Sequence, residues 1–299
     1  MSRWERARRL GRVRGGLEEL DGLVERVVAS GELAASGVAR GECGSVHWVV
    51  VDPTRHPFGV WQGTPTCRRV SELDAVVATN GPMMGRRVFG RKVTRGVLAA
   101  VPASLGIMAA TVGPRLGRRR RSDRVAFGLT IAGATGYALL GGWVPCGIVR
   151  ATTSGIDDRR DFDREGRDHA WIGRMSSDPA DLAIGDGPLP DHVVDGCGGL
   201  VRLVDAGAIR REGDIVRLAG RRGVAAWGVA GNAVVIIGSA DLDVAGAAEV
   251  MQRVGATDAI ATDPSTCAFL ATRGGFHLGP PSWARRRIQS YGLGCGAVH

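Results

Sequence analysis

Apolar positions along the chain follow two spacings, one typical of helices and one typical of strands. From Leu17 to Val28 the apolar residues recur every three or four positions, which predicts an amphipathic helix that ends at Gly31. Segments rich in valine at 45–51 and 75–80 instead predict two strands, and the second ends at Asn80-Gly81. The N-terminal part is therefore expected to contain one helix followed by short strands.

The last third of the chain has the clearest pattern. A run of β-branched residues predicts a strand over Ala233–Ser239, and helical spacing follows the candidate N-cap Asp243 as far as Gly255. A second strand is predicted over Asp258–Asp263. A strand, helix and strand in this order predict parallel strands joined by a right-handed crossover. The expected fold class is α/β (mixed α+β), with helices flanking a sheet.

Two uncharged runs, 96–114 and 125–149, stand on either side of the basic segment PRLGRRRRSDR. Each run is near the length that spans a bilayer, and the arginine-rich connector is typical of a cytoplasmic loop, so a membrane hairpin is one interpretation. Because both runs are rich in small residues, buried strands with glycine turns are the other. The sequence leaves both open and predicts a glycine-rich apolar insertion at about 96–149.

Residues 150–192 are polar and acid-rich, which predicts an excursion over the surface. The expected organisation is a basic arm and amphipathic helix over 1–44, one domain with the apolar insertion over 45–279, and a C-terminal tail over 280–299.

Composition excludes a disordered chain, because 44% of the 299 residues are hydrophobic and 23% are charged. The formal charge is +9, and Lys92 is the only lysine among 39 basic residues. Arginine matches phosphate and carboxylate geometry, so an anionic partner is expected. The N-terminal segment lacks the apolar stretch of a signal peptide, which favours a cytoplasmic or virion-associated protein, with membrane association as the alternative.

Several familiar kinds of site have no support in the sequence. The six cysteines form no CxxC pair and the six histidines are scattered, so no metal site or cofactor is predicted. The spacings GxxxxGK[ST], GxGxxG, GxSxG and HExxH are all absent. What remains is a set of polar residues that follow predicted strands.

Taken in order, five segments resemble the phosphodiester glycosidase domain family, which includes the enzyme that uncovers mannose 6-phosphate and bacterial proteins linked to exopolysaccharides. The segments are VHWVVVDP, SELDAVVATNGPMM, VVDGCGGLVRLVDAG, RRGVAAWGVAGNAVVIIG and DVAGAAEVMQRVGATDAIATDPSTCAFL. The resemblance implies that Asp263 acts as general acid or base, or orients the attacking water, with Asn80 as the second catalytic candidate. It further implies substrate binding by Gly81, Arg222, Ser265 and Thr266, with Arg222 balancing a phosphate charge.

The chain departs from the family pattern at two turns. Pro82 replaces the second glycine of the Asn-Gly-Gly turn, and Pro264 stands where the family has glycines after the aspartate. Proline has no N–H to donate, so an anion-binding turn built on those amides would be damaged.

Three functional interpretations follow. The first is an enzyme that hydrolyses a sugar phosphodiester or a related bond in a cell-surface glycan. The second is an inactive structural protein of a phage tail or other assembly, with neighbouring subunits as partners. The third is a membrane-associated protein that uses the 96–149 hairpin. Nucleic acid is the least supported partner, because no nucleic-acid-binding motif accompanies the arginines.

Overall fold

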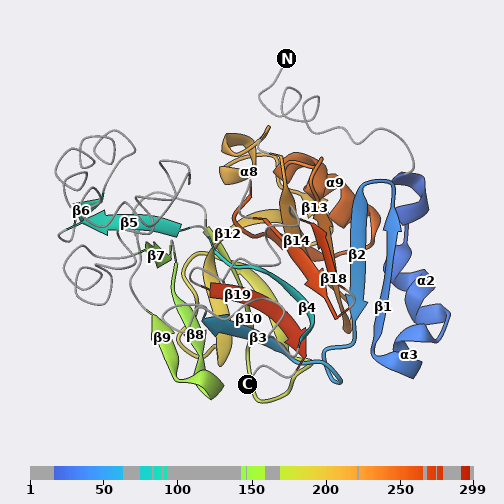
Figure 1. The fold of residues 1–299 in the computed structure, drawn as a ribbon, viewed down its shortest axis with the longest axis horizontal. Coiled ribbons are helices and arrows are strands. Elements are labelled where there is room, and N and C mark those ends of the chain that lie inside the picture. Colours follow the sequence, from blue (N-terminus) through green and yellow to red (C-terminus); the bar gives the residue numbers. More distant parts are fainter. Residues whose placement is uncertain are drawn as a thin grey trace, which may run out of the picture. The chain divides into compact units, whose positions relative to one another are not determined.

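The computed structural model describes residues 17–62, 75–82, 84–88, 91–92, 143–145, 147–158, 169–220, 222–264, 268–273, 275–278 and 291–296 (Figure 1). The chain divides into two compact units, Met84–Val144 and the remainder, Met1–Met83 with Pro145–His299. In the described part of the smaller unit, β5 (Met84–Val88) pairs with β6 (Arg91–Lys92). Strand β7 (Trp143–Pro145) completes a three-stranded sheet of order β6-β5-β7.

The larger unit contains an 11-stranded sheet whose main order is β1-β2-β15-β14-β16-β12-β10-β11, and its described strand pairs are antiparallel. Strand β12 also pairs with β13 and β8, and β8 pairs with β9. The strands are β1 (Val38–Cys43), β2 (Val46–Val51), β8 (Val149–Ala151), β9 (Ile156–Asp158), β10 (His169–Arg174), β11 (Leu182–Asp186), β12 (Asp195–Asp205), β13 (Ala208–Ile209), β14 (Val224–Ala230), β15 (Ala233–Ser239) and β16 (Asp258–Ala261).

A second, five-stranded antiparallel sheet belongs to the same unit and has the order β18-β17-β4-β19-β3. Its strands are β3 (Phe58–Gln62), β4 (Ala75–Asn80), β17 (Leu270–Thr272), β18 (Gly275–Leu278) and β19 (Tyr291–Gly296). Strand β19 comes from the segment expected to be a tail, and it lies between β4 and β3 (Figure 1). Residues near both ends of the chain therefore build this sheet together.

The described helices are short. They are η1 (Leu17–Leu20), α2 (Leu23–Ala29), α3 (Glu32–Ser36), η4 (Thr152–Ser154), α8 (Asp214–Arg217) and α9 (Val244–Arg253). The helix predicted from Leu17 is divided, because Gly22 takes a left-handed conformation with φ 62° between η1 and α2. The prediction for α9 is confirmed, since the Asp243 side chain caps it by accepting a hydrogen bond from the Gly246 N–H.

Two apolar clusters hold the larger unit together. One lies between the helices and one face of the large sheet, and it includes Leu23 from α2, Leu203 from β12 and Met251 from α9. The other contains residues of both sheets, including Trp227 from β14 and Leu293 from β19. The second cluster packs the small sheet against the opposite face of the large one.

The predicted α/β class is wrong. Strands dominate the described residues, and the two larger sheets are antiparallel throughout. Strands β15 and β16 do run in the same direction, as the strand-helix-strand pattern predicts, because both are antiparallel to β14. They are not neighbours, however. The two-residue turn at Gly231-Asn232 folds β14 directly onto β15, so β16 can join only on the far side of β14.

The expectation of a surface excursion over 150–192 is wrong for much of its length. Strand β10 is almost entirely buried in the large sheet, between β11 and β12. Its polar residues are accommodated by pairing: Arg174 forms a buried ion pair with Asp195, and the Asp195 carboxylate also accepts the Thr152 N–H at 2.9 Å. Charges that suggest exposure in the sequence are thus neutralised inside the fold.

The sequence also predicts that N-terminal and C-terminal strands share one sheet system, and this is confirmed. Strand β2 pairs with β15 over Val49↔Ile236 and neighbouring positions, and β4 pairs with β17 and β19. The uncharged runs are different, because residues 93–142, which hold most of both runs, lie outside the described residues. Among the described helices, none is long and apolar enough to cross a bilayer.

Candidate functional site

The strands that precede Asn80 and Asp263 end at the same place, although they belong to different sheets. Asn80 is the last residue of β4, and its side-chain Nδ2 donates a hydrogen bond to the main-chain carbonyl of Asp263 at 2.9 Å. In return, the main-chain N–H of Asp263 donates to the carbonyl of Gly81 at 3.1 Å. These reciprocal bonds fix the backbone at Asp263 against the end of β4. The structure thus brings together three of the predicted site residues.

The Asn80 side chain is buried, with 8% of its surface exposed. Its Oδ1 accepts two hydrogen bonds, one from the Thr262 hydroxyl at 3.0 Å and one from the Phe269 N–H at 3.2 Å. A carbonyl oxygen has two lone pairs, so this acceptor is fully used by the protein. Asn80 therefore holds both ends of the segment that joins β16 to β17.

A further layer of hydrogen bonds supports Asn80 from the apolar cluster between the sheets. The Trp227 indole Nε1 donates to the Thr79 hydroxyl at 2.8 Å, and that hydroxyl donates to the Asn80 carbonyl at 3.0 Å. Trp227 is completely buried and packs edge-on against Phe58, with ring centroids 5.7 Å apart. The chain of bonds gives the β4 end a fixed position relative to β14.

Thr262, directly before Asp263, extends the same network. Its hydroxyl oxygen lies 3.1 Å from the Ala225 carbonyl as well as 3.0 Å from Asn80 Oδ1, and its N–H donates to the Ala225 carbonyl at 3.0 Å. Sequence reasoning did not identify Thr79, Thr262 or Trp227. Thr79 and Thr262 share one weak sequence signal, since each stands directly before a polar Asn or Asp near a strand end. Trp227 has no such signal.

The backbone packed around Gly81 leaves no room for a side chain. A Cβ at this position would lie 2.5 Å from the main-chain carbonyl oxygen of Tyr291 in β19, which is closer than real Cβ contacts. Gly81 and the following Pro82 are both buried. The glycine thus allows β4 and β19 to approach each other, and its carbonyl receives the Asp263 N–H.

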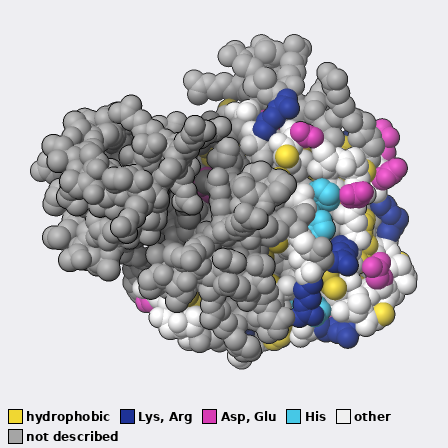
Figure 2. All heavy atoms as spheres, in the orientation of Figure 1, with side chains coloured by type: hydrophobic (Ala, Val, Ile, Leu, Met, Phe, Trp, Pro, Cys, Tyr) yellow, Lys and Arg dark blue, Asp and Glu magenta, His cyan; other side chains and the backbone are white. Residues whose placement is uncertain are grey.

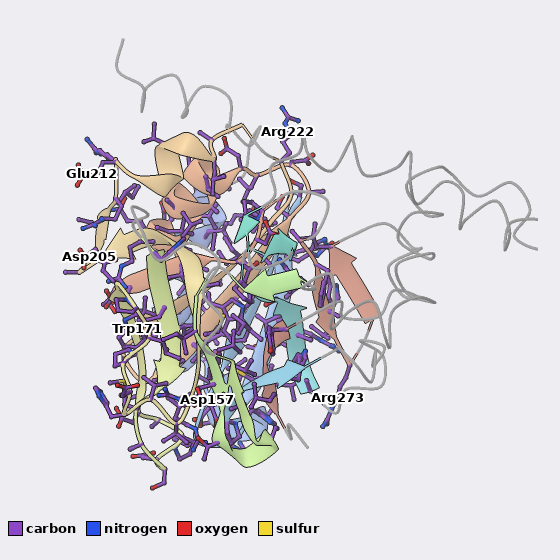
Figure 3. All side chains as sticks on the ribbon, turned by 90° about the vertical axis from the view of Figure 1, so that its left-hand side faces the viewer. Asp157, Trp171, Asp205, Glu212, Arg222 and Arg273 are labelled. Carbon is purple, nitrogen blue, oxygen red and sulfur yellow. The ribbon has the colours of Figure 1, made fainter. Side chains whose placement is uncertain are left out.

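Arg222 lies just before β14 and is exposed. Because β14 is antiparallel to β16, with Ala226 opposite Ala261, the beginning of β14 lies at the end of β16, where Asp263 follows. The loop is anchored by the buried Asp243 carboxylate, which accepts the Gly220 N–H at 2.6 Å. Figure 3 shows the Arg222 side chain directed outward from the ribbon. Arg222 shares an end of the sheet with Asp263 and points to the surface.

The remaining predicted site residues, Ser265 and Thr266, lie outside the described residues. Within the described part of the chain, no group of three or more His, Cys, Asp or Glu side chains is placed to hold a metal ion. Of the predicted site residues with polar side chains, the structure thus describes Asn80, Arg222 and Asp263.

Neither a protein-family model nor a curated protein matches this sequence. Among solved structures, the catalytic domain of zebrafish N-acetylglucosamine-1-phosphodiester alpha-N-acetylglucosaminidase, auto-inhibited by its pro-peptide, is 16% identical with a TM-score of 0.47, covering 87% of this chain and 82% of that one. A hypothetical protein from Synechocystis is 14% identical with a TM-score of 0.45, covering 87% of this chain and 62% of that one. A putative exported protein from Burkholderia pseudomallei is 11% identical with a TM-score of 0.40, covering 84% and 73%. These are distant likenesses of fold.

Proposed function

We propose that this chain binds a sugar phosphodiester at the junction of β4 and β16 and hydrolyses its glycosidic bond. The observation that carries the proposal is the reciprocal pair of hydrogen bonds between Asn80 Nδ2 and the Asp263 carbonyl and between the Asp263 N–H and the Gly81 carbonyl. A carboxylate whose backbone is fixed in this way can be held within reach of a substrate with little loss of entropy on binding. The family resemblance of the surrounding segments points to the same residue.

In the proposed reaction the Asp263 carboxylate acts as a general base. It accepts a proton from a water molecule as the water oxygen attacks the anomeric carbon of the sugar. The bond between that carbon and the phosphate oxygen breaks, and the electron pair leaves with the phosphate, so the products are a free sugar and a phosphomonoester. Arg222 offers its charge to the phosphate, and Ser265 and Thr266 are proposed to hydrogen-bond the substrate oxygens.

Asn80 is proposed as a positioning residue. Since both lone pairs of Oδ1 are used by Thr262 and Phe269, its contribution is to hold the Asp263 segment, with its remaining Nδ2 hydrogen as a donor for substrate. This role differs from direct participation in the chemical step, because replacing Asn80 would displace Asp263 without removing a reacting group.

One observation favours a second candidate, a glycan-binding protein without turnover. Pro82 and Pro264 are both buried and flank the Gly81–Asp263 bond, so neither turn can supply an N–H to an anion at those positions. In this alternative the junction keeps its shape and its hydrogen bonds to sugar hydroxyls, and the anion-binding part of the site is lost. The described residues add no observation in favour of an assembly component or a membrane hairpin.

The deciding experiment compares the full chain with its Asp263→Asn variant on a methyl diester of glucose 1-phosphate, with release of reducing sugar as the measure. Asp181→Asn is the matched control, because Asp181 is an exposed aspartate directly before the edge strand β11, which β10 and β12 separate from β16. We expect Asp263→Asn to lower turnover by roughly a hundredfold or more, and Asp181→Asn to leave it unchanged. Equal turnover in all three proteins would remove Asp263 from the mechanism.

If the unaltered chain shows no turnover, titration calorimetry with the same diester separates the two candidates. Binding that is weakened in an Asn80→Ala variant would support the glycan-binding alternative. The absence of both turnover and binding would contradict both.

A further inference from the structure

Two histidines from different sheets meet at the surface of the larger unit. His47 lies on β2 of the large sheet and His277 on β18 of the small sheet, and their ring centroids are 5.3 Å apart at an interplanar angle of 41°. Figure 2 shows histidine side chains gathered at one place on the molecular surface, with acidic and basic side chains nearby. The pair is distinct from the Asn80–Asp263 junction, so the inference below is independent of the proposed function.

Each ring has one further polar neighbour. His47 Nδ1 lies 3.5 Å from Glu42 Oε2, and the glutamate side chain is 73% exposed, so solvent weakens this interaction. His277 Nε2 lies 2.7 Å from the Thr272 hydroxyl on β17. A neutral imidazole can take either role in that hydrogen bond, whereas a protonated one can only donate.

The charged groups around His277 come from β1 and β2. Burial lowers the pKa of His277 below its usual 6.5, and His47 and Arg40 lower it further, while Glu42 acts in the opposite direction. Strand β15, which also packs against β18, carries the sequence AVVIIGS and brings no titratable side chain. Arg273, in the turn after β17, is exposed. At neutral pH the His277 ring is therefore uncharged.

The direction of the pH effect follows from this shift. A histidine whose pKa is lower in the folded protein binds fewer protons there than in the unfolded chain. Its contribution to stability is complete above about pH 6.5, the usual value, and is lost as the pH falls from there through the folded-state pKa. A protonated His277 ring would be repelled by the Arg40 guanidinium, which is one of the groups that lower the pKa of His277.

We propose that the contact between His47 and His277 is an acid-sensitive link between the two sheets, which loosens the β17–β18 hairpin when the His277 ring is protonated. The hairpin is suited to such a change, because among the described strands β18 is an edge strand that pairs only with β17. The β17 strand also adjoins β4 along Leu270↔Thr79, so loosening would reach the strand that carries Asn80.

Hydrogen exchange of the full chain, followed by mass spectrometry of the peptide that covers residues 270–278, tests the proposal. Rates at pH 7.5 and pH 5.5 are compared after correction for the intrinsic effect of pH on exchange. We expect the corrected rate to rise at pH 5.5, by at most about tenfold, because this pH lies one unit below the usual histidine pKa of 6.5 in the open hairpin. In His277→Gln, which keeps a polar partner for Thr272 and does not titrate, the rise should disappear. The control His192→Gln, at an exposed loop position, should behave as the unaltered chain.

A rise in His277→Gln equal to that of the unaltered chain would overturn the proposal. If His277→Gln does not fold, His47→Gln takes its place, because it removes the neighbouring charge and leaves the Thr272 contact intact. A smaller rise in that variant supports the link, and an unchanged rise contradicts it. A proton NMR titration of the unaltered chain is decisive without any substitution: His277 titrating at or above pH 6.5 would also overturn the proposal.

Discussion

The indole N–H of Trp227 donates a hydrogen bond to the hydroxyl of Thr79, with 2.8 Å between Nε1 and Oγ1. Trp227 belongs to the large sheet and Thr79 to the small one, and both side chains are completely buried. The apolar packing between the two sheets therefore includes a specific buried polar bond. That bond sets the position of β4, whose last residue, Asn80, holds the segment at Asp263.

Replacing Trp227 by Phe removes this bond and keeps most of the ring. We expect the free energy of unfolding to fall by about 1–3 kcal/mol, from the lost hydrogen bond and the smaller side chain. Urea denaturation measures this change in the free energy of unfolding. Trp48→Phe is the control, because Trp48 is only partly buried and packs on the helix side of the large sheet. A Trp227→Phe loss no larger than the control's would mean that the bond contributes nothing measurable.

Gly81 should tolerate no side chain. In Gly81→Ala the new Cβ would lie 2.5 Å from the Tyr291 carbonyl oxygen, a main-chain atom that can move only with β19. We expect a loss of about 1–3 kcal/mol in the free energy of unfolding, the usual cost of overpacking. In Gly198→Ala the nearest atom lies 3.4 Å away, an ordinary contact, so this variant should lose clearly less. Thermal unfolding of both variants makes the comparison, and equal losses would show that the approach of β4 to β19 is not the cause.

Part of this arrangement could be predicted from the sequence. The strand end at Asn80 could be predicted from the turn residues after an apolar run, whereas β16 ends at Ala261, two residues before the predicted end at Asp263. Asn80 and Asp263 do meet in the fold. The antiparallel class also has a signal in the sequence, the two turn residues Gly231-Asn232 between apolar runs, but the strand-helix-strand interpretation overlooks this hairpin and so misses that β14 lies between β15 and β16. Strand β10 could not be predicted for another reason. It lies in a polar, acid-rich stretch typical of the surface, and the sequence does not show that Arg174 pairs with Asp195 in the neighbouring strand.

Arg150 provides a test of such buried charges. It is 7% exposed, and its NH1 donates to the main-chain carbonyls of Pro190, Asp191 and Val193. A lysine cannot reproduce this arrangement, since its donors radiate from a single atom and lack the planar guanidinium. We expect Arg150→Lys to lower the free energy of unfolding by about 1–3 kcal/mol in urea denaturation.

The control for Arg150 is Arg253→Lys. Arg253 pairs with Asp21 at 2.8 Å, but both side chains are substantially exposed, at 42% and 58%. Exposed ion pairs contribute at most about 1 kcal/mol, so this variant should remain close to the unaltered chain. A larger effect at Arg253 than at Arg150 would contradict our view of the 190–193 segment.

Two cysteines should be unreactive in the folded protein. Cys197 and Cys295 are fully buried, and burial raises the pKa of both thiols well above the usual value of 9.0. The nucleophile is the thiolate, so at pH 8 both should resist alkylation by iodoacetamide until the chain unfolds. Peptide mapping after brief labelling, with and without urea, measures the alkylation of each cysteine. Labelling of either residue without urea would show that its strand opens readily.

The central place of β19 also affects when the fold can be completed. Within the described part of the chain, β3 pairs only with β19, and β4 pairs with β17 and β19; both partner strands follow far along the chain. During synthesis, residues 58–62 and 75–80 therefore emerge long before the strands that will satisfy their backbone groups. The large sheet can begin to assemble in this interval, but the small sheet must wait for residues 291–296. Contacts between such distant segments make folding slow, and in the meantime two apolar strands with unpaired edges remain exposed to aggregation.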